Sequence, residues 1–291
     1  MSVPPSFSRA TLVTTLRAAG CVFAEDEAEL LLSAASSPAA LALMVSRRVD
    51  GTPLEHVVGR AEFDGLRIAV GPGVFVPRRR TEFLVRQAAG LAAATGPRPA
   101  PAPVHVPGPV TAGDAPCPAP EPGPAPVVVD LCCGSGALGA ALAARLGRVE
   151  LHAADVEPAA VEYARRNIGA RGRVHLGDLF DPLPAALRGR VSVLLANVPY
   201  VPTGDVPLLP AEARVHEPLV ALDGGADGLD VMRRVVAGAP DWLAPGGSLL
   251  MEAGARQAEL ARETVRAAGL VPRVVTSEEW CATVVIGTRP A

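Results

Sequence analysis

The amino-acid sequence predicts an α/β protein, in which a doubly wound, mostly parallel sheet follows a small helical unit and a β-hairpin. Seven short apolar runs follow residue 126, and segments of helical length separate most of them. A glycine-rich turn joins the first run to the first of these segments. Near-continuous apolar strands that alternate with helices are typical of a sheet that is covered on both faces.

Helical signals fill residues 8 to about 48. Ser8 precedes the first periodic segment as an N-cap, and Gly20 ends that segment. Acidic residues open the second segment, where they suit the helix dipole. Ser37 followed by a proline opens the third segment. We therefore predict a helical N-terminal domain over residues 1–58.

A hairpin and a further helix follow. The pair Asp64-Gly65 lies between two short apolar stretches and is a strong signal for a two-residue hairpin turn. We predict a β-hairpin linker over residues 59–77 and a helix from about 80 to 94. The main α/β domain is expected to cover residues 78–291.

The segment 97–126 differs from the rest of the chain, because it holds 12 of the 30 prolines and almost no periodic apolar pattern. Such a composition cannot bury enough apolar surface to offset the entropy lost on ordering. We therefore expect a disordered insertion. A proline-rich recognition site is the alternative interpretation.

The seven apolar runs are the expected strands of the sheet. No helix fits between the last two runs, so the last strand is expected to be antiparallel. The strands are expected at residues 127–131, 149–155, 173–180, 191–197, 248–254, 272–277 and 282–289.

Composition and charge argue against several classes of protein. The net charge of −3 gives no general basic surface for nucleic acid. All 27 basic residues are Arg, so no lysine can act as a base or form a Schiff base. Without a signal-peptide pattern or a long apolar run, we expect a cytoplasmic protein with no membrane contact. Neither a disulfide framework nor a metal site is expected from the scattered cysteines, Cys21, Cys117, Cys132, Cys133 and Cys281.

The end of the first strand carries a candidate nucleotide site. Ligands of open α/β sheets bind at the carboxyl ends of strands, and the turn after Asp130 presents backbone amides at a helix N-terminus. Glycines 134, 136 and 139 match G-x-G-x-x-G, a weak signal that the strand-turn-helix context strengthens. A plain tight turn is the alternative. The residues expected to contact a cofactor here are Asp130, Cys132, Cys133, Gly134, Ser135 and Gly136.

Acidic residues also end the next two strands. Asp155 follows Asp130 by 25 residues, where a carboxylate would accept hydrogen bonds from both ribose hydroxyls. Asp178 ends the third strand, where it or a neighbouring amide could read an adenine edge. A dinucleotide does not explain Asp178, so adenosine with a small reactive group fits better. Val156 and Leu179 complete these expected cofactor contacts.

The fourth strand ends in an unusual loop. Asn197, Val198, Pro199 and Tyr200 put an amide, a stiff proline and an aromatic ring where a buried strand stops. The alternatives without a catalytic role are that Asn197 only forms a turn and that Tyr200 is a partly buried core residue. We predict that these four residues form the catalytic loop and that Asn197 also faces the cofactor.

Several stretches, among them "VVVDLCCGSGALGAALA", "ANVPYVP" and "EPLVALDGGADGLD", resemble the protein-(glutamine-N5) methyltransferases of the HemK/PrmC family, which modify the GGQ glutamine of peptide-chain release factors. The resemblance runs through most of the chain except the proline-rich segment. It implies a helical substrate domain, a hairpin hinge and a class I S-adenosylmethionine (SAM) methyltransferase domain. The stretches that carry it are "GTPLEHVVGRAEFDGLRIAVGPGVFVPR", Thr81-Glu82, "VVVDLCCGSGALGAALA", "ANVPYVP", "EPLVALDGGADGLD" and "VVIGTR".

The resemblance implies SAM as the cofactor and methyl transfer to the side-chain amide nitrogen of a glutamine. Asn197 Oδ1 would accept one amide hydrogen, and the main-chain carbonyl of Val198 the other. Tyr200 would form a wall of the pocket, and Arg78 and Glu82 would also contact the substrate. The expected partner is a protein with an exposed glutamine, with a release factor as one candidate and no direct contact with nucleic acid.

Three departures from the family pattern favour a divergent paralogue, whose substrate need not be a release factor. Val198 and Arg79 stand where prolines are usual. Cys132 replaces the first glycine of the turn, which indicates that this position needs no positive φ. The competing interpretations are a nucleic-acid amino-methyltransferase, a SAM-binding scaffold without catalysis and, last, a NAD-dependent oxidoreductase.

Overall fold

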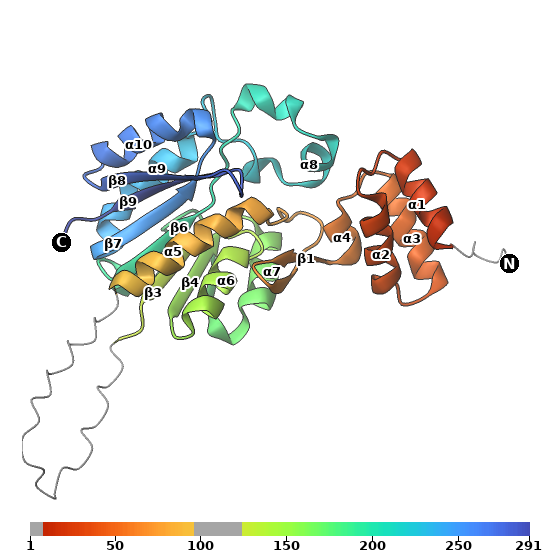
Figure 1. The fold of residues 1–291 in the computed structure, drawn as a ribbon. Helices are drawn as coiled ribbons and strands as arrows, with labels where there is room; N and C mark the ends of the chain where they lie inside the picture. The colour runs from red at the N-terminus through yellow and green to blue at the C-terminus, as the bar shows by residue number, and fades with distance from the viewer. Residues whose placement is uncertain (1–7, 96–123) are drawn as a thin grey trace, which may run out of the picture.

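The computed structural model describes residues 8–95 and 124–291 and confirms the predicted fold class (Figure 1). Short N-terminal helices and a two-stranded hairpin precede a seven-stranded sheet with helices on both faces. Most of the segment predicted to be a disordered insertion, Cys117 included, lies outside the described ranges. Within these ranges, no helix is long and apolar enough to cross a membrane.

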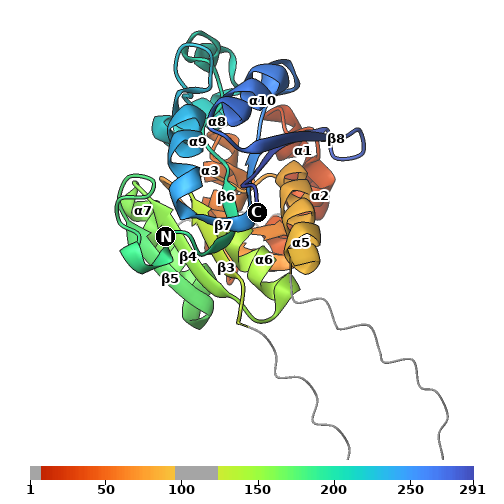
Figure 2. The ribbon, with the colours of Figure 1, turned by 90° about the vertical axis from the view of Figure 1, so that its left-hand side faces the viewer.

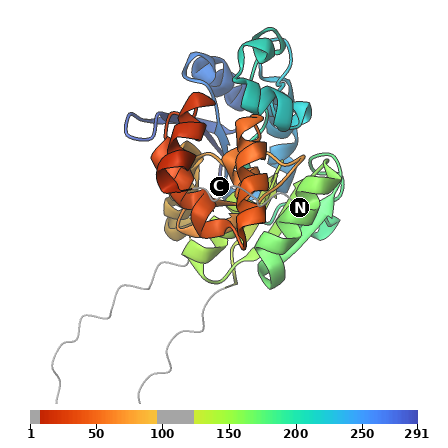
Figure 3. The same ribbon diagram turned by 90° about the vertical axis from the view of Figure 1, so that its right-hand side faces the viewer.

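The N-terminal helices, which face the viewer in Figure 3, form their own small hydrophobic core. Both predicted caps are confirmed, since Ser8 Oγ accepts a hydrogen bond from the Thr11 amide and Ser37 Oγ accepts one from the Ala40 amide. Apolar side chains spaced three or four residues apart, such as Leu12 and Leu16, are fully buried between the helices. The helices are α1 (Arg9–Ala18), α2 (Ala24–Ala34), α3 (Pro38–Val49) and α4 (Leu54–Val58).

The predicted hairpin is confirmed as β1 (Arg60–Phe63) and β2 (Leu66–Ala69). Asp64 and Gly65 both have positive φ, 49° and 77°, as a two-residue turn with the twist of the strands requires. The hairpin packs on the main domain, where the Asn167 side chain bonds both the amide and the carbonyl of Ala69. A short 3-10 turn, η1 (Arg79–Thr81), then leads into α5 (Glu82–Thr95).

The sheet has the order β5-β4-β3-β6-β7-β9-β8 (Figure 2). All neighbouring pairs are parallel except those made by β9, which confirms the prediction of an antiparallel last strand. The chain turns back between β3 and β6, so this is the switch point where ligands bind. The strands are β3 (Val127–Leu131), β4 (Glu150–Asp155), β5 (Gly172–Leu176), β6 (Val191–Ala196), β7 (Leu243–Glu252), β8 (Val271–Ser277) and β9 (Ala282–Thr288).

Helices cover the two faces of the sheet through two separate apolar clusters. Side chains from α5, α6 and α7 pack on one face, and those from α9 and α10 pack on the other. Between β6 and α9 the chain forms short helices that the sequence did not predict, because they lack a periodic apolar pattern. These elements are α6 (Ala137–Leu146), α7 (Pro158–Ile168), η4 (Thr203–Leu208), α8 (Ala211–His216), η5 (Leu219–Ala221), α9 (Asp230–Trp242) and α10 (Ala258–Ala267).

Candidate active site

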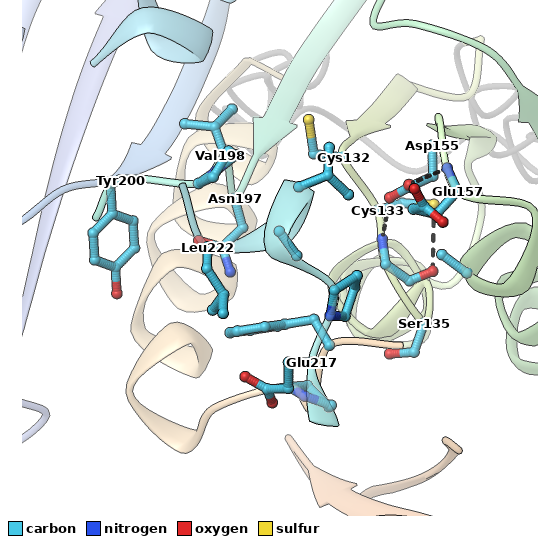
Figure 4. A pocket seen from close by; sticks show the side chains of 18 of the residues that line it. Cys132, Cys133, Ser135, Asp155, Glu157, Asn197, Val198, Tyr200, Glu217 and Leu222 are labelled. Atoms are coloured by element: carbon cyan, nitrogen blue, oxygen red, sulfur yellow. Dashed lines mark hydrogen bonds between the residues drawn. The ribbon is translucent and has the colours of Figure 1, made fainter. Parts of the chain in front are cut away.

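A cavity of about 590 Å³ lies at the carboxyl ends of β3, β4 and β6 (Figure 4). Asp155 and Glu157 lie on one side of it, and Asn197 and Tyr200 lie on the other. The segment that leads into α5 and the short helices around α8 supply the remaining wall. The strand ends predicted to carry the site therefore meet at one cavity.

The turn between β3 and α6 brings backbone amides to this cavity. Cys132 has a φ of 52°, so the prediction that this position needs no positive φ was wrong. A left-handed conformation at a residue other than glycine costs about 1–2 kcal/mol. Gly136 shows a real need for glycine, since a Cβ there would lie 3.1 Å from the Ala164 backbone of α7. Burial raises the pKa of the thiols of both Cys132 and Cys133, so both are protonated at neutral pH.

Asp130 and Gly136 are not among the residues that line the cavity, so direct contact of either residue with a cofactor stays a prediction. The Asp130 side chain is fully buried, and its Oδ2 accepts a hydrogen bond from the Gly139 amide at 2.8 Å. Its Oδ1 is buried without a partner among the described residues. Burial raises the pKa of this carboxyl to about 7. Asp130 thus stabilises the turn through its hydrogen bond to the first turn of α6 and does not line the cavity.

Asp155 lines the cavity and is held by backbone amides. Its Oδ2 accepts from Gly134 N at 2.8 Å, and its Oδ1 accepts from Glu157 N at 2.9 Å. Burial raises the pKa of Asp155, and these amides oppose that shift. Each oxygen keeps a second lone pair that can accept from a ligand hydroxyl. The other predicted contacts on this lining are Cys132, Cys133, Gly134, Ser135, Val156, Asp178, Leu179 and Asn197.

Asp178 has a partner that the sequence did not reveal. Arg234 of α9 forms an ion pair with its carboxylate, and both residues line the cavity. The Asp178 side chain is 47% exposed, so the pair stands at the rim of the cavity. A ligand amino group would therefore compete with Arg234 for this carboxylate.

The loop after β6 presents an unusual buried acceptor. Asn197 Oδ1 is buried and has no hydrogen-bond partner among the described residues. The loop is fixed by main-chain bonds, as Val201 N donates to Leu222 O and Gly224 N donates to Val201 O. Gly228 packs so closely that a Cβ would lie 2.3 Å from the Tyr200 carbonyl. The glycines of "DGGADGLD" thus let this block lie directly against the loop.

The residues predicted to contact the substrate behave differently from one another. Arg78 lines the cavity, and its guanidinium donates to the buried carboxylate of Glu217, which also lines it. Tyr200 lines it as well. Glu82 starts α5, is buried and is not part of the lining, so its contact with the substrate stays a prediction. Glu217 was not predicted, although it opens the stretch "EPLVALDGGADGLD" that carries part of the resemblance.

Known proteins resemble this chain in sequence and fold. A family model for a methyltransferase domain matches residues 128–218. A release factor glutamine methyltransferase of Geobacter sulfurreducens is 37% identical over 74% of this chain and 66% of its own length. Those of Streptomyces coelicolor and Mycolicibacterium smegmatis are 35% and 36% identical over 82% of this chain and over 72% and 80% of their own lengths. The chain therefore spans about two thirds to four fifths of these relatives.

A solved structure supports the fold. The catalytic domain of hMettl16, determined in complex with the MAT2A 3'UTR hairpin 6, matches with a TM-score of 0.51 over 87% of this chain and 82% of that chain. The two sequences are 13% identical, so this likeness concerns the fold alone.

The strand order with its single reversed strand, together with the domain match, defines a class I SAM-dependent methyltransferase. Within that class, the relatives described above are all release factor glutamine methyltransferases, which confirms the predicted resemblance. The chain belongs to the release factor glutamine methyltransferase family.

Proposed function

We propose that this chain transfers the methyl group of SAM to the side-chain amide nitrogen of a glutamine, and that this glutamine belongs to a peptide-chain release factor. The observation that carries the proposal is Asn197 Oδ1, which is buried without a hydrogen-bond partner among the described residues; Asn197 lines the same cavity as the turn after β3. A buried acceptor without a donor is costly, and a primary amide offers two N–H donors. The names of the relatives support a release factor as the substrate.

The cofactor fits the residues on the opposite side of the cavity. The free lone pairs of Asp155 would accept hydrogen bonds from the ribose hydroxyls of SAM. The turn around Gly134 and Ser135 would bind the polar methionine end of SAM. Val156 and Leu179 line the same cavity and offer apolar surface for a planar base. When bound, SAM supplies an electrophilic methyl group on a positively charged sulfur.

The difficulty of the reaction lies in the nucleophile, because an amide lone pair is delocalised into its carbonyl. In our proposal Asn197 Oδ1 accepts one N–H of the substrate amide and the Val198 carbonyl accepts the other. These two bonds aim the nitrogen at the methyl group at roughly 3–3.5 Å and stabilise the positive charge that develops. The proton can leave after transfer, so no dedicated base is required. Valine at position 198 keeps the carbonyl that the chemistry needs.

The test uses labelled SAM and a cell extract from a strain that lacks this protein. Protein and nucleic acid are separated, and the label is mapped by mass spectrometry. We expect the label on one glutamine of a release factor, and none when that glutamine is changed to glutamate. Label on RNA or DNA would show a nucleic-acid methyltransferase instead. Tight SAM binding with no labelled product would show a scaffold.

A further inference from the structure

A buried carboxylate at the end of β7 collects donors from three side chains. Glu252 is 3% exposed. Its Oε2 accepts from Thr81 Oγ1 at 2.6 Å, and its Oε1 accepts from Arg80 Nε at 2.8 Å and from the Tyr200 hydroxyl at 3.1 Å. Two donors come from the turn before α5, and the third comes from the loop after β6. One carboxylate thus joins two separate walls of the active-site cavity.

The direction of the tyrosine hydrogen bond is fixed by charge. Burial raises the pKa of Tyr200 to about 12, and the nearby negative charge of Glu252 adds to that effect. The phenol is therefore protonated at neutral pH and donates its proton to Glu252. Arg80 also contacts the phenol oxygen and stabilises the same cluster. The Arg80 side chain is 46% exposed, so its guanidinium bonds Glu252 and Tyr200 on one side and faces solvent on the other.

The Tyr200 ring is not enclosed by protein on all sides. A second cavity, of about 410 Å³, is lined by Tyr200, Arg80 and Glu252 together with the loop between β8 and β9. Tyr200 and Arg80 line the active-site cavity as well. The tyrosine therefore stands between two open spaces. Without its hydrogen bond, the ring would have room to move into the second cavity.

We propose that Glu252 is a positioning residue, which holds Tyr200 through its hydroxyl as the wall against which the acceptor amide lies. Thr81 and Arg80 hold Glu252 in turn, which gives the Thr81 hydroxyl a role in the site. The placement of Tyr200 stands on the geometry alone. Its effect on turnover rests on the proposed function.

The placement is tested by fluorine NMR, because the chain has only two tyrosines, Tyr163 and Tyr200. Protein labelled with 3-fluorotyrosine gives two resonances, which the Tyr163→Phe variant assigns. We expect Glu252→Gln to shift or broaden the Tyr200 resonance and to leave that of Tyr163 unchanged. Thr81→Val should act in the same direction, and Thr81→Ser should restore the native signal.

The matched control is Glu278→Gln, which removes another carboxylate from the lining of the second cavity. It should leave both fluorine signals in place. An unchanged Tyr200 resonance in both Glu252→Gln and Thr81→Val would overturn the proposal. So would equal shifts of both tyrosines, which would indicate a general loss of structure.

The kinetic arm is a double-mutant cycle on methyl transfer. We expect Glu252→Gln to lower kcat about 10-fold or more, since small misplacements in a site are costly. SAM affinity, measured by calorimetry, should be unchanged. In a Tyr200→Phe background the same substitution should have almost no further effect, because the hydroxyl it acts through is gone. If the kcat losses of Glu252→Gln and Tyr200→Phe multiply in the double variant, the proposal is overturned. If no glutamine is methylated by the native protein, the proposed function fails while the fluorine experiment still decides the placement.

Discussion

Arg78 Nη2 lies 2.6 Å and 2.7 Å from the two carboxylate oxygens of Glu217, a residue 139 positions later in the chain. The Glu217 side chain is 1% exposed and also accepts from the Val76 amide. Burial raises the pKa of Glu217, while the charge of Arg78 opposes that shift. The pair therefore joins the segment after the hairpin to the short helices around α8.

Replacing Arg78 by Met leaves the Glu217 carboxylate buried without its cation. We expect the free energy of unfolding at pH 7.5 to fall by about 2 kcal/mol, less than for a fully buried pair because Arg78 is 36% exposed. Denaturant titration measures this. The control is Arg9→Met, which removes an exposed pair with Glu29 and should cost less than about 1 kcal/mol. Equal losses in the two variants would contradict the argument.

Asn197→Ala separates binding of the cofactor from chemistry. Methyl transfer should fall about 10²–10³-fold, as for removal of a group that stabilises the transition state. SAM affinity should stay close to native. Stability should not decrease, since the substitution removes a buried acceptor that has no partner among the described residues. Radiolabel transfer, calorimetry and denaturant titration check the three parts. Native turnover in this variant would refute the role of Asn197.

Cys132 tests the turn itself. Cys132→Gly relieves the left-handed strain but adds freedom to the unfolded chain, so we expect stability within about 1 kcal/mol of native. Cys132→Val puts a β-branched residue at the same positive φ and should be clearly less stable. Both are compared by thermal unfolding with and without SAM. If valine is tolerated as well as glycine, the turn does not have this conformation in solution.

Asp130 gives a prediction about pH. Its folded pKa of about 7 is above the unfolded value of about 3.9, so the native state holds more protons between these values. Proton binding at Asp130 therefore stabilises the native state at low pH, and this stabilisation is lost as the pH rises towards 7.

The side-chain amide of the Asp130→Asn variant does not titrate. The free energy of unfolding of the variant, relative to that of the native protein, should therefore rise by about 2 kcal/mol from pH 5 to pH 7. Urea titrations at the two values measure the difference. A constant difference between the two proteins would mean that Asp130 is ionised throughout this range.

The sequence was enough to predict the strands, the antiparallel last strand and the cavity at the strand ends, because acids and an asparagine mark those ends. It did not predict the order of the strands in the sheet. The conformation at Cys132 was missed, since a residue other than glycine gives no signal of positive φ. Glu217 was missed because its partner is far away in sequence and its segment has no periodicity. Glu252 also ends a strand, so the rule that found Asp155 could have found it.

The helix α5 and the strand β3 have a practical consequence. The helix begins at Glu82, directly after Thr81 of the active-site lining, and runs for 14 residues, about 20 Å, away from the cavity. Strand β3 ends at the site and starts at the opposite end of the sheet, so the last turn of α5 and the start of β3 both lie far from the cavity (Figure 1). An affinity tag, a dye or a surface tether attached between these two elements should leave methyl transfer intact. This junction is therefore the natural place to immobilise the enzyme and observe single turnovers.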